Sequence, residues 1–338
     1  MKTTKKLRTI PWLMLSILIL IIDAKTAYTG AIDGINLCLR TIIPVLFPFI
    51  VLSAMLNSYL LGSPLSFLKP LSRLCDVPDG AESLLLLGFI GGYPVGAQCL
   101  NEAFESKILS KEDAKRMLVF CNNAGPSFIF GLCGALFDSV LIPFALWIIH
   151  IASALMVGIC LKNDCKPSTI CNITKSITLP QALDKGIKTT AAICGWVILF
   201  RIMITFLQKW FLWALPQPMQ TGIIGMLELS NGCCDLFAVP QHGQRFIMCA
   251  FMLGFGGICV AMQTASVAKL IFTPIYIIGK LLQAVISFTM ASILQFFIFP
   301  NTHQWHLPAV IYIITIIICV SMFIVFRKNS SISKRFHV

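Results

Sequence analysis

Long apolar runs separated by short polar connections constrain this sequence more than any other feature. Eight runs of roughly 17–25 residues, the length that a helix needs to cross a bilayer, lie near 9–28, 41–61, 112–137, 139–161, 189–210, 245–270, 275–299 and 308–326. They are continuous, whereas the strands of an outer-membrane barrel alternate between apolar and polar residues. With 57% hydrophobic and 12% charged residues, the chain is predicted to be an all-α polytopic membrane protein with about eight transmembrane helices.

The basic residues predict how this chain is oriented in the membrane. If the N-terminus is cytoplasmic, most of the 26 Lys and Arg residues, Lys280 among them, fall on the cytoplasmic side, as the positive-inside rule requires. We therefore expect a multi-pass protein of the cell membrane with both termini in the cytoplasm. The net charge of +12 then reflects topology and not a nucleic-acid-binding face. The exceptions to the rule are Lys25, Arg40, Arg201, Lys209 and Arg245.

Two further apolar stretches, 83–104 and 219–238, are too broken by glycine and polar residues to cross the bilayer, and we predict that both are re-entrant helical hairpins. The first would enter from the cytoplasm and the second from outside, and two spans follow each one. Short segments at 31–34 and 182–186 precede the two halves and are predicted to be amphipathic helices in the interface. Together these features predict an inverted repeat, as in many secondary transporters.

The repeat divides the chain into five segments. No small-residue cleavage site follows the first apolar run, so an uncleaved first span is expected instead of a signal peptide. The predicted segments are a basic N-terminal region with the first span (1–24), a first repeat half (25–161), a polar cytoplasmic linker (162–179), a second half (180–300), and a last span with a basic tail (301–338).

Four glycine-rich or polar interruptions of apolar stretches are candidates for a solute site, because broken helices offer free backbone N–H and C=O groups at membrane depth. For any single glycine, close helix packing is an equally good explanation. The candidate residues are Gly92, Tyr93, Pro94 and Gln98 in the first interruption, Asn122, Asn123 and Ser127 in the second, Glu228, Ser230 and Asn231 in the third, and Gln263 in the fourth.

Glu228 is the most informative of these residues. A carboxylate among apolar residues at membrane depth is energetically expensive, which indicates a functional role such as binding a coupling proton or sodium ion. Arg201 also lies in an apolar run. It could provide a counter-charge to Glu228, hold an anionic solute, or extend its guanidinium to the interface, and the sequence favours none of the three.

The sequence predicts neither a cofactor nor a metal site, and no enzymatic activity. The 14 cysteines are scattered and lie mostly in apolar runs, which is typical of small buried groups in a reduced setting. His303 and His306 have no neighbouring carboxylate or thiolate, so a polar loop is expected there instead of a metal site. His150 is expected to be a hydrogen-bonded histidine within a span.

The four interruptions also carry a family resemblance. Their sequences are Gly-Gly-Tyr-Pro-Val-Gly-Ala-Gln at 91–98, Phe-Cys-Asn-Asn-Ala-Gly-Pro-Ser-Phe-Ile-Phe-Gly at 120–131, Gly-Met-Leu-Glu-Leu-Ser-Asn-Gly at 225–232 and Leu-Gly-Phe-Gly-Gly-Ile-Cys-Val-Ala-Met-Gln at 253–263. In this order they resemble the nucleoside-recognition (gate) domain membrane proteins, in particular the sporulation integral membrane protein subgroup. The resemblance implies a fold akin to concentrative nucleoside carriers and, for the subgroup, export of dipicolinate toward the developing spore.

These observations predict a sporulation-linked membrane transporter of a small polar or anionic solute, with a dipicolinate-like or nucleoside-like substrate. The alternative is a non-transporting membrane scaffold required for spore maturation. The scaffold hypothesis predicts that the polar residues of the hairpins are dispensable and that surface segments such as 162–179 matter. The expected partners are a small solute, a coupling ion and the lipid bilayer, without nucleic acid.

Overall fold

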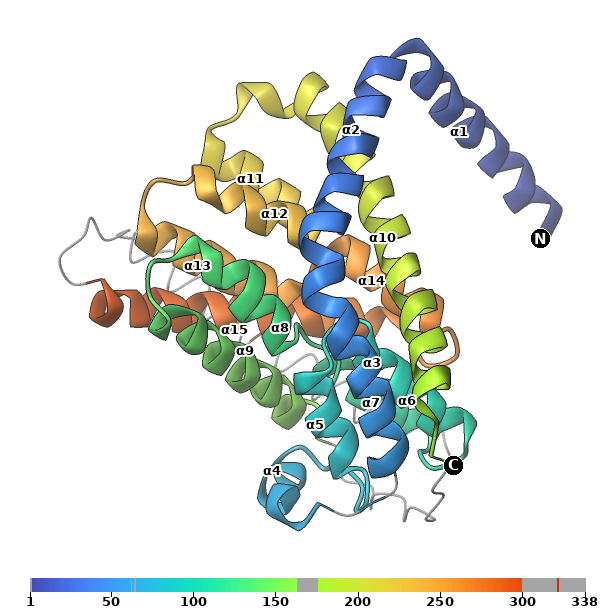
Figure 1. The fold of residues 1–338 in the computed structure, drawn as a ribbon, viewed down its shortest axis with the longest axis vertical. Helices are drawn as coiled ribbons and strands as arrows, with labels where there is room; N and C mark the ends of the chain where they lie inside the picture. The colour runs from blue at the N-terminus through green and yellow to red at the C-terminus, as the bar shows by residue number, and fades with distance from the viewer. Residues whose placement is uncertain (1, 62, 64, 163–175, 300–320, 322–338) are drawn as a thin grey trace.

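Every regular element in the part of the chain that the structure describes is a helix (Figure 1). The structure is a computed structural model, and it describes residues 2–61, 63, 65–162, 176–299 and 321. This confirms the predicted all-helical class. Short 3-10 or π-helical segments lie at Cys38–Ile42, Ser66–Leu68, Ile129–Cys133, Gly134–Leu136, Leu212–Ala214 and Leu236–Ala238, and a short helix α4 lies at Lys69–Leu74.

Five helical stretches of the described chain are long and apolar enough to cross a membrane. They match the runs predicted near 41–61, 139–161, 189–210, 245–270 and 275–299. The stretches are Ala24–Leu60, formed by α2 (Ala24–Leu37), a π-helical turn and α3 (Ile43–Leu60); α9 (Leu141–Cys160); α10 (Leu179–Trp210); His242–Val267, formed by α13 (His242–Phe255) and α14 (Gly257–Val267); and α15 (Pro274–Ile298).

The three other predicted crossings are not single long helices in the described part of the structure. The run at 9–28 is divided, because α1 (Lys2–Ile22) ends before Asp23, whose side chain accepts a hydrogen bond from the backbone of α2. The run at 112–137 is divided between α7 (Lys111–Phe120) and a short apolar stretch that begins with α8 (Pro126–Phe128). The run at 308–326 lies outside the described residues apart from Ser321.

The predicted interfacial segments at 31–34 and 182–186 are wrong as separate short helices. The first lies inside α2 and the second inside α10, which runs unbroken for 32 residues. The helix starts lie further upstream, at Asp23 and at Thr178, which forms a capping box with Gln181. Both long helices are then stabilised by packing against each other.

The helix α2–α3 and the helix α10 run antiparallel along their whole length (Figure 1). Near one end, Lys209 Nζ lies 2.5 Å from Asp23 Oδ2, and further along Arg201 donates to Asp33 Oδ2 at 3.0 Å. At the far end, Gly186 packs on the side chain of Val51. The leading helices of the two halves therefore point in opposite directions.

Each half contains the same order of elements. Apart from short 3-10 turns and α4, which precedes the helix pair of the first half, a long helix is followed by a pair of short helices, then a broken helix, then another long helix. The pairs are α5 (Glu82–Ile90) with α6 (Val95–Glu105), and α11 (Gln217–Leu227) with α12 (Leu229–Asp235), and the members of each pair pack against each other. They occupy the two stretches predicted to be hairpins.

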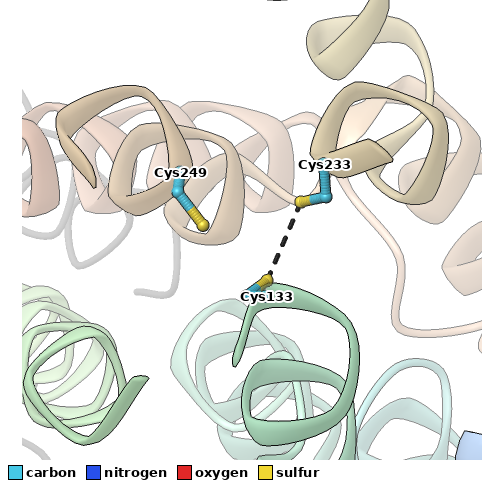
Figure 2. A group of neighbouring side chains, drawn as sticks. All are labelled: Cys133, Cys233 and Cys249. Carbon is cyan, nitrogen blue, oxygen red and sulfur yellow. Dashed lines mark hydrogen bonds between the residues drawn. The ribbon is translucent and has the colours of Figure 1, made fainter. Parts of the chain in front are cut away.

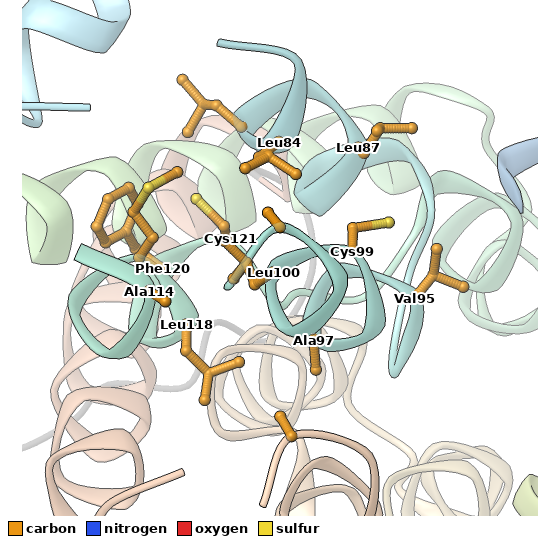
Figure 3. Close-up of a cluster of buried hydrophobic side chains, with 14 of the residues drawn as sticks. Leu84, Leu87, Val95, Ala97, Cys99, Leu100, Ala114, Leu118, Phe120 and Cys121 are labelled. Atoms are coloured by element: carbon orange, nitrogen blue, oxygen red, sulfur yellow. The ribbon is translucent and has the colours of Figure 1, made fainter. Parts of the chain in front are cut away.

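The first pair is held by an apolar core with α7 (Figure 3). Leu87, Leu100 and Leu118 contribute to this core and are fully buried. Two glycines allow the backbones to approach closely: a Cβ on either Gly88 or Gly96 would lie 2.2 Å from the carbonyl oxygen of Cys121. The first helix pair is therefore seated directly on the break that follows α7.

Candidate functional site

The four interruptions, far apart in the sequence, meet at one place in the structure. A Cβ on Gly125 would lie 3.0 Å from the Cα of Gly92, so the first two breaks touch through their backbones. Tyr93 extends from the first break to the fourth, where a Cβ on Gly256 would lie 2.9 Å from its hydroxyl. The neighbouring Gly257 has positive φ, and a Cβ on it would lie 3.3 Å from Leu227 O and from Leu229 N in the third break.

A cavity lies where these breaks meet, between the two halves of the chain. The space that the centre of a water molecule can occupy measures about 30 Å³, which is room for water but not for a nucleoside. Five of the predicted site residues line it, namely Gly92, Tyr93, Glu228, Ser230 and Gln263. Apolar residues complete the wall, including Ile42 and Leu46 from the first half and Ile193, Val197 and Val260 from the second.

Glu228 is held at this wall by the start of α12. Its carboxylate accepts hydrogen bonds from the backbone N of Ser230 at 3.1 Å, and from the backbone N and Nδ2 of Asn231 at 2.7 and 2.6 Å. Only 2% of the residue is exposed. These donors stabilise a negative charge at a helix N-terminus, so the side chain is at once a helix cap and a polar group of the cavity.

Asn122 is fully buried and does not line the cavity. Its Oδ1 accepts from the backbone N of Ala97 at 3.2 Å, and its Nδ2 donates to Thr264 Oγ1 at 2.9 Å and to the Tyr276 hydroxyl at 3.0 Å. These partners come from α6, α14 and the start of α15. Asn122 thereby joins the first helix pair to the second half of the chain.

Asn123 is also buried away from the cavity, in a second polar network. Its Nδ2 donates to Phe120 O at 2.6 Å, and its Oδ1 accepts from Lys280 Nζ at 3.0 Å and from Gln283 Nε2 at 3.1 Å. Next to it, His150 Nε2 accepts from the backbone N of Ala124 at 3.0 Å. The network ties the second break to α9 and α15.

Lys280 is the functional candidate that the sequence reasoning missed. The charge count placed it among the cytoplasmic lysines, and the structure shows that it lies within α15 and is 1% exposed. The criterion that singled out Glu228, an ionisable side chain inside an apolar run, applies equally to Lys280. It was overlooked because it lies near the beginning of its run, where a lysine ordinarily reaches the interface.

The remaining candidates lie outside the cavity wall. Gln98 donates to Thr189 Oγ1 at 3.0 Å, and Pro94 follows a cis peptide bond after Tyr93. Ser127 lies in the short helix α8. Arg201 is paired with Asp33, and its guanidinium makes no ion pair with Glu228. The structure thus shows a role that was not among the three considered for Arg201, a link between the long helices α2 and α10.

Three buried cysteines form a separate cluster (Figure 2). The sulfur atoms of Cys133, Cys233 and Cys249 all lie within 4.8 Å of one another, and the first two are 3.9 Å apart. Soft metals bind thiolates at such spacings. The cluster is embedded in an apolar core with Leu236 and Phe246, where several thiolate charges would be costly. We therefore interpret these thiols as packing groups that join the two halves.

Comparison with known proteins supports a membrane protein related to sporulation. The chain is 24% identical over 336 residues, covering 84% of this chain and 80% of the relative, to the sporulation integral membrane protein YlbJ of Bacillus subtilis (strain 168). No family model and no solved structure matches the chain. Together with the long apolar helices, this similarity shows a multi-pass integral membrane protein that is distantly related to a sporulation membrane protein.

Proposed function

We propose that this protein is a membrane transporter for a small polar or anionic solute, which binds in the cavity between the two halves. The observation that carries the proposal is the meeting of four chain breaks, two from each half, around a cavity with a buried carboxylate in its wall. Irregular backbone at membrane depth is tolerated where it lines a cavity. Secondary transporters place their solute sites at such breaks between repeats.

The proposal includes a membrane topology. The opposite directions of α2–α3 and α10 and the repeated element order support an inverted repeat with α5–α6 and α11–α12 as re-entrant hairpins. In this topology the chain crosses the membrane about eight times and both termini are cytoplasmic. The resemblance to gate-domain proteins and the sporulation protein named above support a link to sporulation and a dipicolinate-like or nucleoside-like solute.

In this proposal the observed cavity represents a state that is too narrow for the solute. It has room for water alone, and Tyr93 reaches across it to the fourth break, where its hydroxyl donates to Leu253 O at 3.5 Å. A solute can enter only if the loop that carries Tyr93 moves away from the second half. In this proposal the helix pairs move against the remaining helices, and Glu228 binds the coupling proton or sodium ion.

Reconstitution in liposomes tests the proposal. The purified protein is expected to transport radiolabelled dipicolinate or uridine, and Glu228→Gln is expected to lower the rate at least tenfold while the protein remains folded. Lys188→Met is the matched control, because Lys188 forms an exposed ion pair with Asp184 far from the site. Absence of transport of both solutes by the folded wild-type protein would contradict the proposal and favour the scaffold hypothesis.

A further inference from the structure

We infer that Lys280 is the fixed positive charge that makes the cavity selective for anions. The inference rests on the proposed function, since it names the residue that selects the class of solute for the same site. The inference and the proposed function can be tested separately, because anion binding and solute transport are different measurements.

Lys280 has no carboxylate partner in the part of the protein that the structure describes. It lies seven residues into the 25-residue helix α15 and is 1% exposed. The ion pairs found among the described residues involve other lysines and arginines, such as Lys185, Lys209 and Arg201. A buried cation in a membrane span is expensive unless a partner of opposite charge reaches it.

The contacts of Lys280 solvate its ammonium group without cancelling the charge. Nζ donates to Asn123 Oδ1 at 3.0 Å and to Gln283 Oε1 at 2.9 Å, and both oxygens belong to neutral amides. The rings of Tyr93 and Tyr276 lie 5.2 and 5.9 Å from Nζ, within the range of cation–π attraction. The site therefore offers acceptors and ring faces to an ammonium group, and none of these contacts supplies a negative charge.

The position of this charge connects it to the cavity. Tyr93 and Ala124 both line the cavity, and Lys280 contacts the ring of Tyr93 and the side chain of Asn123, the residue before Ala124. The ammonium group thus lies directly behind the cavity wall. In the proposed opening of the cavity, Tyr93 moves, and its ring then no longer lies against the ammonium group of Lys280.

An anion in the opened cavity would meet this charge in a surrounding of low polarity, where charge–charge attraction is much stronger than in water. A neutral solute of the same size would gain nothing from it. Lys280 also suits this role chemically, because its ammonium group has three donors on a flexible stem. Two of these donors can stay on Asn123 and Gln283 while the third turns to the solute.

Four variants distinguish the effect of the Lys280 charge on anion binding from the effect of this side chain on folding. Lys280→Met removes the charge and keeps the length of the side chain, while Lys280→Arg keeps the charge. Asn123→Asp and Gln283→Glu leave the lysine in place and give it an internal carboxylate at the positions now 3.0 and 2.9 Å from Nζ. Lys188→Met, at an exposed ion pair, is the control for loss of one lysine.

Equilibrium dialysis of the detergent-purified protein measures binding of dipicolinate, benzoate and inorganic phosphate as anionic probes and of uridine as a neutral probe. We expect the wild type to bind at least one anion, Lys280→Met, Asn123→Asp and Gln283→Glu to weaken that binding at least tenfold, and Lys280→Arg to stay within threefold. Uridine binding, where present, should change less than twofold in all variants.

The inference is overturned if the folded wild type binds none of the anions, or if the variants bind them as the wild type does. If Lys280→Met does not fold, Asn123→Asp and Gln283→Glu decide the question, since each alters a single amide. Anion binding that depends on Lys280 in a protein that transports nothing would uphold the inference and contradict the proposed transport. Transport of uridine, without binding of any anion, would uphold the proposed transport and contradict the inference.

Discussion

At the scale of single residues, Glu228 combines a structural role with the functional role that we propose for it. Its backbone is extended, with φ of −144° and ψ of 121°, so it ends α11 and caps α12. Three hydrogen bonds hold the carboxylate in place at the cavity wall. A buried carboxylate with this many donors remains an acceptor, and its removal affects both the helix start and the polarity of the cavity.

The capping role of Glu228 predicts a graded loss of stability. Glu228→Gln keeps an oxygen that can accept from the backbone of α12 and should lower the free energy of unfolding by about 1 kcal/mol. Glu228→Ala removes the cap and should cost about 2 kcal/mol or more. Thermal unfolding in detergent measures both, and equal stability of the two variants would show that the cap contributes little.

Close backbone contact predicts a second residue-scale result. Gly96→Ala would place a Cβ 2.2 Å from the backbone oxygen of Cys121, and we expect a loss of about 1–3 kcal/mol because backbone must shift. Gly195→Ala is the matched control, since no atom lies within 4 Å of its Cβ position in α10, and it should gain about 0.5–1 kcal/mol from helix propensity. The melting temperatures of the two variants give the comparison, and similar shifts would contradict the packing argument.

At the scale of elements, the antiparallel pair of α2–α3 and α10 forms the link between the halves. Gly30 and Gly34 let α2 approach the backbone of α10, where their Cβ positions would lie 2.8 and 2.9 Å from the Cα atoms of Ile202 and Ile198. Arg201 and Asp33 then meet beside this contact. Small residues at a helix crossing allow such close packing in membranes, and the ion pair fixes the register.

The position of Arg201 predicts that it affects stability and not solute binding. Arg201→Gln breaks the pair with the half-exposed Asp33 and should lower the free energy of unfolding by about 0.2–1 kcal/mol. Anion affinity should stay within twofold, in contrast to the Lys280 variants. The same dialysis assay checks this, and a tenfold loss of affinity would restore Arg201 as a solute-binding residue.

At the scale of the whole molecule, two halves with the same element order enclose one cavity. Neither half forms the cavity alone, because its wall contains Tyr93 from the first half and Glu228 from the second. Polar links between the halves, such as Asn122 with Thr264 and Lys280 with Asn123, surround it. In the proposed transport mechanism, a motion that opens the cavity would rearrange these links together.

The proposed topology predicts the result of reporter fusions. Fluorescent protein fused after Lys162 should fluoresce, because this position follows α9 on the side that the proposed topology assigns to the cytoplasm. Alkaline phosphatase fused after Ala214, beyond the end of α10, should be active outside the cell. Activity of both reporters on the same side of the membrane would contradict the inverted repeat.

The sequence alone determined the features that depend on local chemistry. Runs of apolar residues predicted the long helices, and Gly125-Pro126 and Gly256-Gly257 marked helix breaks, because proline and glycine act on the backbone at their own positions. The signals at Asp23 and Thr178 would also have placed the starts of α2 and α10 correctly. The sequence therefore predicted the long helices and their breaks, while the predictions at 9–28, 31–34, 112–137 and 182–186 missed where helices begin and end.

Only the tertiary structure decided which side chains face the cavity. Asn122 and Asn123 look like solute ligands in the sequence, yet both turn into networks with Tyr276 and Lys280, more than a hundred residues away. Arg201 proved to pair with Asp33, and Lys280 proved to be buried. The physical reason is that a polar group in an apolar interior binds whatever partner the fold brings within hydrogen-bond distance, and those partners come from the other half of the chain.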